Sequence, residues 1–303
     1  METRLVVGLD EDGMRLDSVL ATYNPERSRS HFKKLISDGR VYVNGEPKKA
    51  SFSCSVDDEI VYEEAEPASC DIVPVDIPID IIYEDDDILI VNKPKGMVVH
   101  PAPGHIDDTL VNAVMYHCGE SLSGINGELR PGIVHRIDRD TTGSLVICKN
   151  DYAHSFIADQ IAKHSVTRRY RGIVIGGGLD ETGTVSGAIG RDPKDRKRMA
   201  INEKNGKPAV THFRTLSTNN GYSYMEFELE TGRTHQIRVH MASIGHPLLG
   251  DEVYGPKKCK FKLQGQCLHA MTLGFIHPDT KEYVEFTAPL PEYFNMLLDK
   301  LCL

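Results

Sequence analysis

The stretch that decides the fold is His135-Arg136-Ile137-Asp138-Arg139-Asp140-Thr141-Thr142-Gly143, followed by the apolar run Leu145-Val146-Ile147-Cys148. It sets the carboxylate of Asp138 between two arginines, with hydrophobic segments on either side. A charged turn between two core segments can hold a reactive side chain rigidly. An acid flanked by cations stays ionised and serves as a nucleophile or base. The alternative is a solvated loop with surface ion pairs.

This stretch resembles the active-site motif of the RluA family of RNA pseudouridine synthases. Further segments extend the resemblance, in the family's order, from about Ile81 to Pro291. These segments are Tyr83-Glu84-Asp85 with Ile88 to Pro101, Arg169 to Val174, Thr231 to His240 with Gly250-Asp251 and Tyr254-Gly255, and Leu268-His269-Ala270 with His277-Pro278. Several motifs in one order are far more specific than any one of them.

The resemblance implies roles for particular residues. Asp138 is the expected catalytic acid, and Arg238 is expected to pair with it. Tyr170 is expected to stack under a flipped uracil and assist proton transfer, while Arg136 inserts where the base was. Arg139, next to the acid, is expected to contact RNA. The implied reaction moves uracil from an N1 to a C5 bond to ribose and needs no cofactor. Attack by the aspartate and a glycal route remain alternatives.

Composition is that of an ordinary globular enzyme. The 303 residues suggest two domains, and a hydrophobic share of 40% is enough for a core. The sequence shows no apolar run of about 18 residues and no charged leader before an apolar stretch, so we expect no membrane contact and a cytoplasmic location. The seven cysteines are scattered without a Cys-x-x-Cys pair, which argues against a disulfide framework or zinc knuckle. We expect a monomer.

The net charge of −9 conflicts at first with an RNA partner, which favours a positive protein surface. The conflict is resolved by where the acidic residues lie in the sequence. Ten acids and no Lys or Arg lie between Glu63 and Asp87, and without these ten the formal charge is +1. Two basic clusters could meet phosphates or be solvated faces. The clusters are Arg168, Arg169 and Arg171, and Arg191, Lys194, Arg196, Lys197 and Arg198.

We predict an acidic, proline-containing linker over residues 63–80. The preceding unit, residues 12–62, has two short amphipathic helix patterns, the second ended by Gly39, and then a hairpin cue at Asn44-Gly45. This order resembles the small α/β RNA-binding domain named after ribosomal protein S4. The alternative is a generic helix-hairpin domain with scattered charge. The resemblance implies a basic face made of Arg15, Arg29, Lys33, Lys34 and Arg40.

For residues 81–303 we predict an α+β fold, because strands alternate with few helices and there is no regular strand-helix repeat. The resemblance implies the pseudouridine synthase fold, with a mixed, largely antiparallel central sheet and peripheral helices. One helix is predicted from Asp151, as its cap, to Ile161, and another from about Thr234 until Gly245. The run Gly176-Gly177-Gly178 is predicted to form a hairpin turn.

The leading hypothesis is an RNA pseudouridine synthase acting on structured RNA. The S4-like unit favours large-subunit ribosomal RNA as the target, with transfer RNA as the alternative. A second hypothesis is a non-catalytic RNA-binding protein, which would have no use for a buried acid opposite an arginine. A third is a glycoside hydrolase using Asp138 and Asp140, which would need an aromatic sugar platform, and the chain has no tryptophan.

Overall fold

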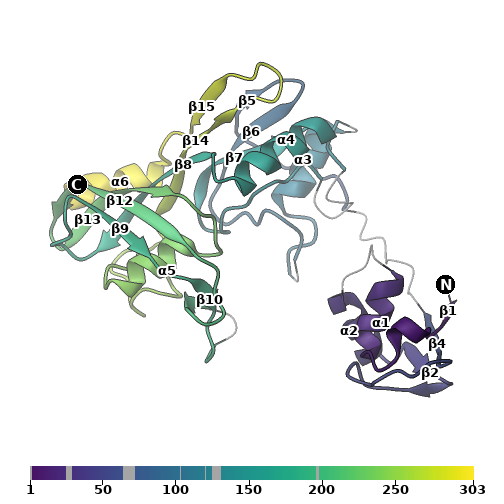
Figure 1. Cartoon of the computed structure of the whole chain (residues 1–303). Helices are drawn as coiled ribbons and strands as arrows, with labels where there is room; N and C mark the ends of the chain where they lie inside the picture. The colour runs from purple at the N-terminus through teal and green to yellow at the C-terminus, as the bar shows by residue number, and fades with distance from the viewer. Residues whose placement is uncertain are drawn as a thin grey trace. The chain divides into compact units, whose positions relative to one another are not determined.

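The computed structural model describes residues 2–24, 29–63, 72–102, 104–119, 121–124, 131–195 and 198–303. The chain divides into two compact units, Met1–Cys70 and Asp71–Leu303 (Figure 1). Residues 64–71, within the predicted linker, lie outside the described residues. None of the helices in the described ranges is long and apolar enough to cross a membrane.

The end of the predicted linker belongs to the second unit. Ile72 is buried in its main hydrophobic cluster, and the side chain of Asn112 donates to the carbonyl of Val73. The N–H of Val75 in turn bonds the carbonyl of Asn112. The end of the predicted linker thus has contacts with the second unit, because a proline-containing segment can still find hydrogen bonds and a buried apolar contact.

The first unit packs two helices against a small sheet. Its apolar helix positions, among them Leu16, Leu20 and Phe32, form one core with Ile60 of the sheet. Asn44 and Gly45 have φ of 52° and 79°, as a two-residue hairpin requires. The sheet order is β1-β4-β2-β3. The elements are β1 (Glu2–Val6), η1 (Leu9–Glu11), α1 (Leu16–Tyr23), α2 (Arg29–Ser37), β2 (Val41–Val43), β3 (Glu46–Pro47) and β4 (Glu59–Glu63).

In the second unit, the described residues form one nine-stranded sheet and a small two-stranded one, β10-β11. The large sheet runs β5-β6-β7-β14-β8-β13-β12-β9, with β15 also paired to β14. Within the described ranges β7 and β14 pair in parallel and the other neighbours are antiparallel. The prediction of a mixed, largely antiparallel sheet is confirmed. The strands are β5 (Ile81–Glu84), β6 (Ile88–Lys93), β7 (Thr142–Cys148), β8 (Thr167–Ile175), β9 (Thr182–Ser186), β10 (Ile189–Arg191), β11 (Met199–Ile201), β12 (Val210–Asn219), β13 (Tyr222–Leu229), β14 (Leu268–Ile276) and β15 (Tyr283–Thr287).

The helices of this unit lie around the sheet (Figure 1). Asn150, not Asp151, caps α4: its side chain accepts the N–H of Ala153. The helices are α3 (Leu110–Cys118), α4 (Asp151–Ala162), α5 (Gln236–Ser243) and α6 (Glu292–Leu301).

The glycine run after β8 is not a hairpin turn, contrary to the prediction. The next strand along the chain, β9, is separated from β8 by β13 and β12. Gly176 and Gly178 do adopt positive φ, 107° and 85°. The glycines therefore do adopt backbone conformations typical of a turn. The strand that pairs with β8, however, is decided by packing elsewhere in the sheet.

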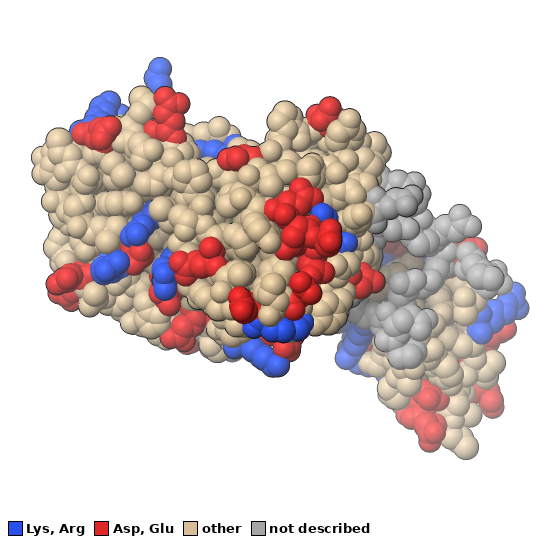
Figure 2. All heavy atoms as spheres, turned by 90° about the horizontal axis from the view of Figure 1, so that it is seen from above, with Lys and Arg blue, Asp and Glu red and all other residues tan. Residues whose placement is uncertain are grey.

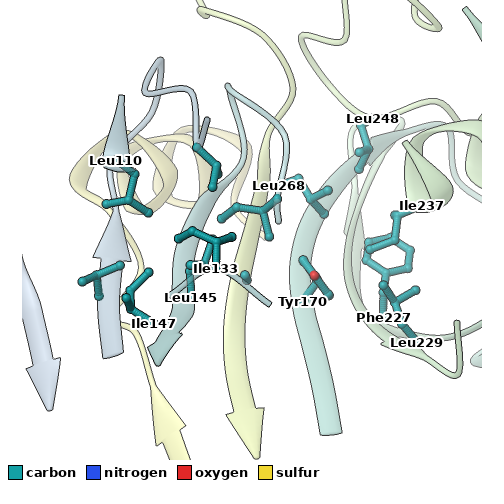
Figure 3. Close-up of a cluster of buried hydrophobic side chains, with 14 of the residues drawn as sticks. Leu110, Ile133, Leu145, Ile147, Tyr170, Phe227, Leu229, Ile237, Leu248 and Leu268 are labelled. Carbon is teal, nitrogen blue, oxygen red and sulfur yellow. The ribbon is translucent and has the colours of Figure 1, made fainter. Parts of the chain in front are cut away.

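A row of buried side chains crosses the sheet and supports the turn before β7. Figure 3 shows the ring of Tyr170 on β8 in this row, with Leu145 and Ile147 of β7 on one side and Phe227 and Leu229 of β13 on the other. These side chains belong to one buried hydrophobic cluster. The cluster joins the strand after the charged turn to the strand that carries the tyrosine.

Gly143, at the start of β7, is where the turn meets the sheet. It pairs with Ala270 of β14 and has a φ of 109°. A Cβ here would collide with the carbonyl oxygen of Ala270 and lie 2.8 Å from its nitrogen. Only glycine permits both this conformation and this approach.

We expect Gly143→Ala to lower the free energy of unfolding by about 3 kcal/mol, the sum of left-handed strain and a backbone clash. Gly178→Ala is the matched control, since its φ is also positive but no atom lies within 4 Å of its Cβ position. The control should lose about 1 kcal/mol. Urea unfolding followed by circular dichroism measures both, and equal losses would refute the role of the close approach.

Candidate active site

The turn that carries Asp138 is fixed by its own backbone and by the partly buried imidazole of His135. The carbonyl of Asp138 accepts the N–H of Thr141 at 3.1 Å. His135 Nε2 accepts the N–H of Val146 at 3.1 Å. Burial, aided by the nearby charge of Arg168, lowers the pKa of His135 to about 3. His135 is thus a neutral acceptor that ties the turn to β7.

Lys93 holds the same turn from within the core. Its side chain is fully buried, and Nζ donates to the carbonyls of Pro94 at 2.9 Å, Met97 at 2.8 Å and Arg139 at 2.9 Å. The N–H of Gly96 bonds the same Arg139 carbonyl. Burial lowers the pKa of Lys93 to about 7. Because Lys93 binds the carbonyl of Arg139, the residue after Asp138, it positions the backbone that carries Asp138.

Arg238, on α5, bridges two carboxylates. Its Nη1 donates to Asp138 Oδ2 at 3.0 Å, while Nε and Nη2 bind Asp251 at 2.7 and 3.0 Å. Asp251 is fully enclosed, and although burial raises its pKa, the bonds from Arg238 outweigh this and lower it. The ring of Tyr254 lies 5.1 Å from the guanidinium carbon. The guanidinium therefore has one orientation, which fixes that of Asp138.

His235 stands on the other side of Asp138. Its Nε2 lies 3.9 Å from Asp138 Oδ1, and its Nδ1 lies 2.8 Å from the hydroxyl of Tyr254. That hydroxyl also accepts the N–H of Met199 at 3.0 Å. Burial lowers the pKa of His235. The ring of His235 thus lies between Asp138 and Tyr254, in a residue whose φ is 56°.

The predicted catalytic residues meet in one open cleft of about 580 Å³. Asp138, Tyr170 and Arg238 line it together with Arg136 and His235. Tyr170 is buried, and burial raises its pKa, with a smaller opposing effect of Arg168. The three come from a turn, a strand and a helix, and the volume is within the range of small-ligand sites.

Three of the other arginines singled out in the sequence of the second unit are paired with acids. Arg139 pairs with Asp140 at 3.0 Å, and Arg169 and Arg171 pair with glutamates of β13 at 3.2 and 2.8 Å. Arg169 and Arg171 therefore do not form the free phosphate-binding cluster considered above. In the other cluster Arg196 and Lys197 lie outside the described residues. Figure 2 shows acidic side chains gathered in a patch on the face seen from above, whereas the basic ones form smaller groups.

In the first unit, a buried acid organises the predicted basic face. Asp17 is fully buried and lies 3.0 Å from nitrogens of Arg15 and Arg29 and 3.6 Å from Nζ of Lys33. Although burial raises the pKa of Asp17, hydrogen bonds from Arg15 and Arg29 hold it well below its usual range. The cations stay about half exposed. Lys34 and Arg40 are exposed as well.

Sequence reasoning missed several residues around Asp138. In the sequence, Asp251, Tyr254 and His235 stand out only as parts of the motifs quoted above. Lys93 was noted only within a strand. The spacing Asp251-x-x-Tyr254, which lets Asp251 accept the N–H of Tyr254 at 3.0 Å, was the available signal.

Two family models and several known proteins match this chain. Residues 87–243 match the family model of RNA pseudouridylate synthases, and residues 14–60 match that of the S4 domain. The chain is 49% identical over 96% of its length to a Bacillus subtilis protein named an uncharacterized RNA pseudouridine synthase, YlyB, and covers 95% of it. It is 47% identical over 95% of its length to ribosomal large subunit pseudouridine synthase D of Zymomonas mobilis, covering 94% of it.

The fold also matches a solved human structure, RNA pseudouridylate synthase domain containing 1. The TM-score is 0.58 at 26% identity, and the match covers 78% of this chain and 98% of the human one.

The charge on Asp17 has a consequence for stability in acid. Because its folded pKa lies below its unfolded value, its contribution is present above pH 4 and is lost as the pH falls. We expect wild type to lose about 1 kcal/mol more than Asp17→Asn between pH 6 and pH 3, since the amide does not titrate. Hydrogen-exchange protection of α1 amides, corrected for intrinsic rates, measures this. Identical losses in the two proteins would contradict it.

Proposed function

Because the chain belongs to the RNA pseudouridylate synthase family, and is therefore an isomerase acting on RNA, we propose that it converts specific uridines of large-subunit ribosomal RNA to pseudouridine. The observation that carries the proposal is the Asp138–Arg238 pair in a cleft that also contains Tyr170. Relatives named large-subunit pseudouridine synthase D support the ribosomal target. Transfer RNA is the alternative.

Asp138 supplies the reactive carboxylate. Its Oδ2 accepts from Arg238, whereas no N–H or O–H of the described residues donates to Oδ1. Oδ1 is therefore the oxygen that reacts. In the direct route it bonds to ribose C1′ as the C1′–N1 bond breaks and uracil leaves with the electron pair. In the glycal route it removes the proton on C2′ as the C1′–N1 bond breaks and a C1′=C2′ double bond forms. C5 of the rotated uracil then bonds to C1′, displacing the carboxylate in the direct route and with return of a proton to C2′ in the glycal route. Both routes end with loss of the C5 proton and protonation of N1.

The target uridine must leave its stack to reach Asp138. Arg136, two residues before Asp138, also lines the cleft. Its side chain fills the position in the RNA stack that the extruded uracil leaves empty. Tyr170 provides a ring on which the extruded uracil stacks. Arg139 and the cations around Asp17, with Lys34 and Arg40, hold the rest of the RNA. We also propose that the enzyme acts in the cytoplasm as a monomer.

Mapping pseudouridines in cells that lack the gene tests the activity and the target together. We expect carbodiimide-primer extension to lose one or more stops in large-subunit ribosomal RNA, with rescue by wild type and not by Asp138→Asn. The variant is isosteric but has no anionic oxygen. Arg169→Met, which removes a charge far from the carboxylate chemistry, should rescue. Unchanged ribosomal and transfer RNA maps would sink the proposal, and a transfer RNA site would replace the target.

Arg238→Lys tests whether the bridging guanidinium positions Asp138. An ammonium group cannot bind Asp251 through two nitrogens and still reach Asp138, yet it leaves Asp251 with a cation. We expect the single-turnover rate to fall about 100-fold with RNA affinity retained. Arg238→Ala is less informative, because it leaves the buried carboxylate of Asp251 without a positive partner and so destabilises the fold. A variant that turns over normally but binds RNA weakly would refute the positioning role.

A further inference from the structure

One side of the cleft carries a buried cation that has no counter-charge. Arg168 is 7% exposed and lines the cleft. Its Nη2 donates to the carbonyl of Glu230 at 3.2 Å, and its Nε has no hydrogen-bond partner. Within the described part of the chain, no carboxylate lies within ion-pair distance of it. A buried guanidinium in this condition has lost water without gaining an anion.

The strand alternation puts Arg168 on the catalytic face. Arg168 and Tyr170 are buried on one face of β8, while Arg169 and Arg171 point to the other and pair with glutamates. Arg168 is thus separated from the acids that neutralise its neighbours.

A second arginine and a glycine complete the wall. Arg233 lines the same cleft, and its Nε donates to the carbonyl of Pro208 at 3.0 Å. Between the two arginines, Gly232 lies so close that a Cβ there would be 2.6 Å from Nη1 of Arg168. The missing side chain leaves room for the guanidinium at the cleft wall.

The balance of charge in the cleft is also unusual for this acidic chain. Among the described residues that line it are Arg136, Arg168, Arg233 and Arg238, against a single carboxylate, Asp138. Arg238 is already bound by two acids. Two adjacent guanidiniums whose described hydrogen-bond acceptors are backbone carbonyls fit an anion with several oxygens.

We infer that Arg168 and Arg233, flanking Gly232, form a subsite for one phosphate of the RNA strand next to the extruded uridine. A phosphodiester matches because it carries a full negative charge and two free oxygens, whereas a uracil carbonyl would leave the buried charge uncompensated. The inference rests on the proposed function, since it assumes that an RNA strand enters this cleft.

The test compares wild type with Arg168→Met, which keeps the length and removes the charge. Arg169→Met is the matched control: it removes the adjacent charge of the same strand from the opposite face. Gly232→Ala is a second variant that keeps the charge but pushes the guanidinium aside. The measurements are kcat and KM on a large-subunit ribosomal RNA transcript, and the salt dependence of binding to a short oligouridylate.

For Arg168→Met we expect KM to rise about tenfold at unchanged kcat, as when one charge-assisted contact is lost. The slope of log affinity against log salt should shrink by about 0.7, the value for one phosphate on a single strand. Gly232→Ala should raise KM by a smaller factor, and Arg169→Met should leave both quantities as in wild type.

A fall in kcat alone, with wild-type KM and salt slope, would overturn the phosphate subsite and leave Arg168 a structural residue. If Arg168→Met does not fold, Gly232→Ala decides, and a wild-type KM in that variant overturns the inference. Failure of the proposed function looks different: wild type would not convert uridine in any RNA, while the oligouridylate slopes would still test the subsite.

Discussion

The site depends on one guanidinium shared by two carboxylates. Arg238 holds Asp251 through two nitrogens and Asp138 through a third. Asp251 is enclosed and also accepts backbone N–H groups at 2.9 and 3.0 Å. The Arg238–Asp251 ion pair is therefore a rigid support for Asp138. Asp138 is partly exposed and lines the cleft, with its Oδ2 bound by Arg238. A buried pair thus orients a reactive group that itself remains accessible.

The turn bearing Asp138 is held just as firmly from the sheet side. Lys93 donates hydrogen bonds to backbone carbonyls of the turn and of the segment after β6. Gly143 lets the end of the turn approach β14 closely, where β7 and β14 pair in parallel. His135 closes the turn onto β7 as a neutral acceptor. These contacts use backbone atoms, so they fix the turn's path without consuming the carboxylate. The apolar row through Tyr170 then sets the distance between the turn and the next strands.

Much of the fold followed from pattern alone, and the errors have physical causes. Asn44-Gly45 gave the hairpin of the first unit because its backbone conformation is local. The hairpin predicted at the glycine run after β8 was wrong, because glycines that favour positive φ indicate a turn but not which strands pair with each other. The burial of Ile72 could not be predicted, because acidic, proline-containing sequence does not reveal that one apolar residue packs into the hydrophobic cluster of the second unit.

The sequence alone determined the chemistry that is available: an acid, a tyrosine and an arginine in motifs whose order identified the family. Only the tertiary structure decided which cation meets which acid. Arg139, adjacent to Asp138 in sequence, turns to Asp140, while Arg238, 100 residues away, takes Asp138. Likewise Arg168 and Arg169 are neighbours with opposite surroundings. The reason is that charge pairing depends on distance and burial in space, which chain packing sets and sequence adjacency does not.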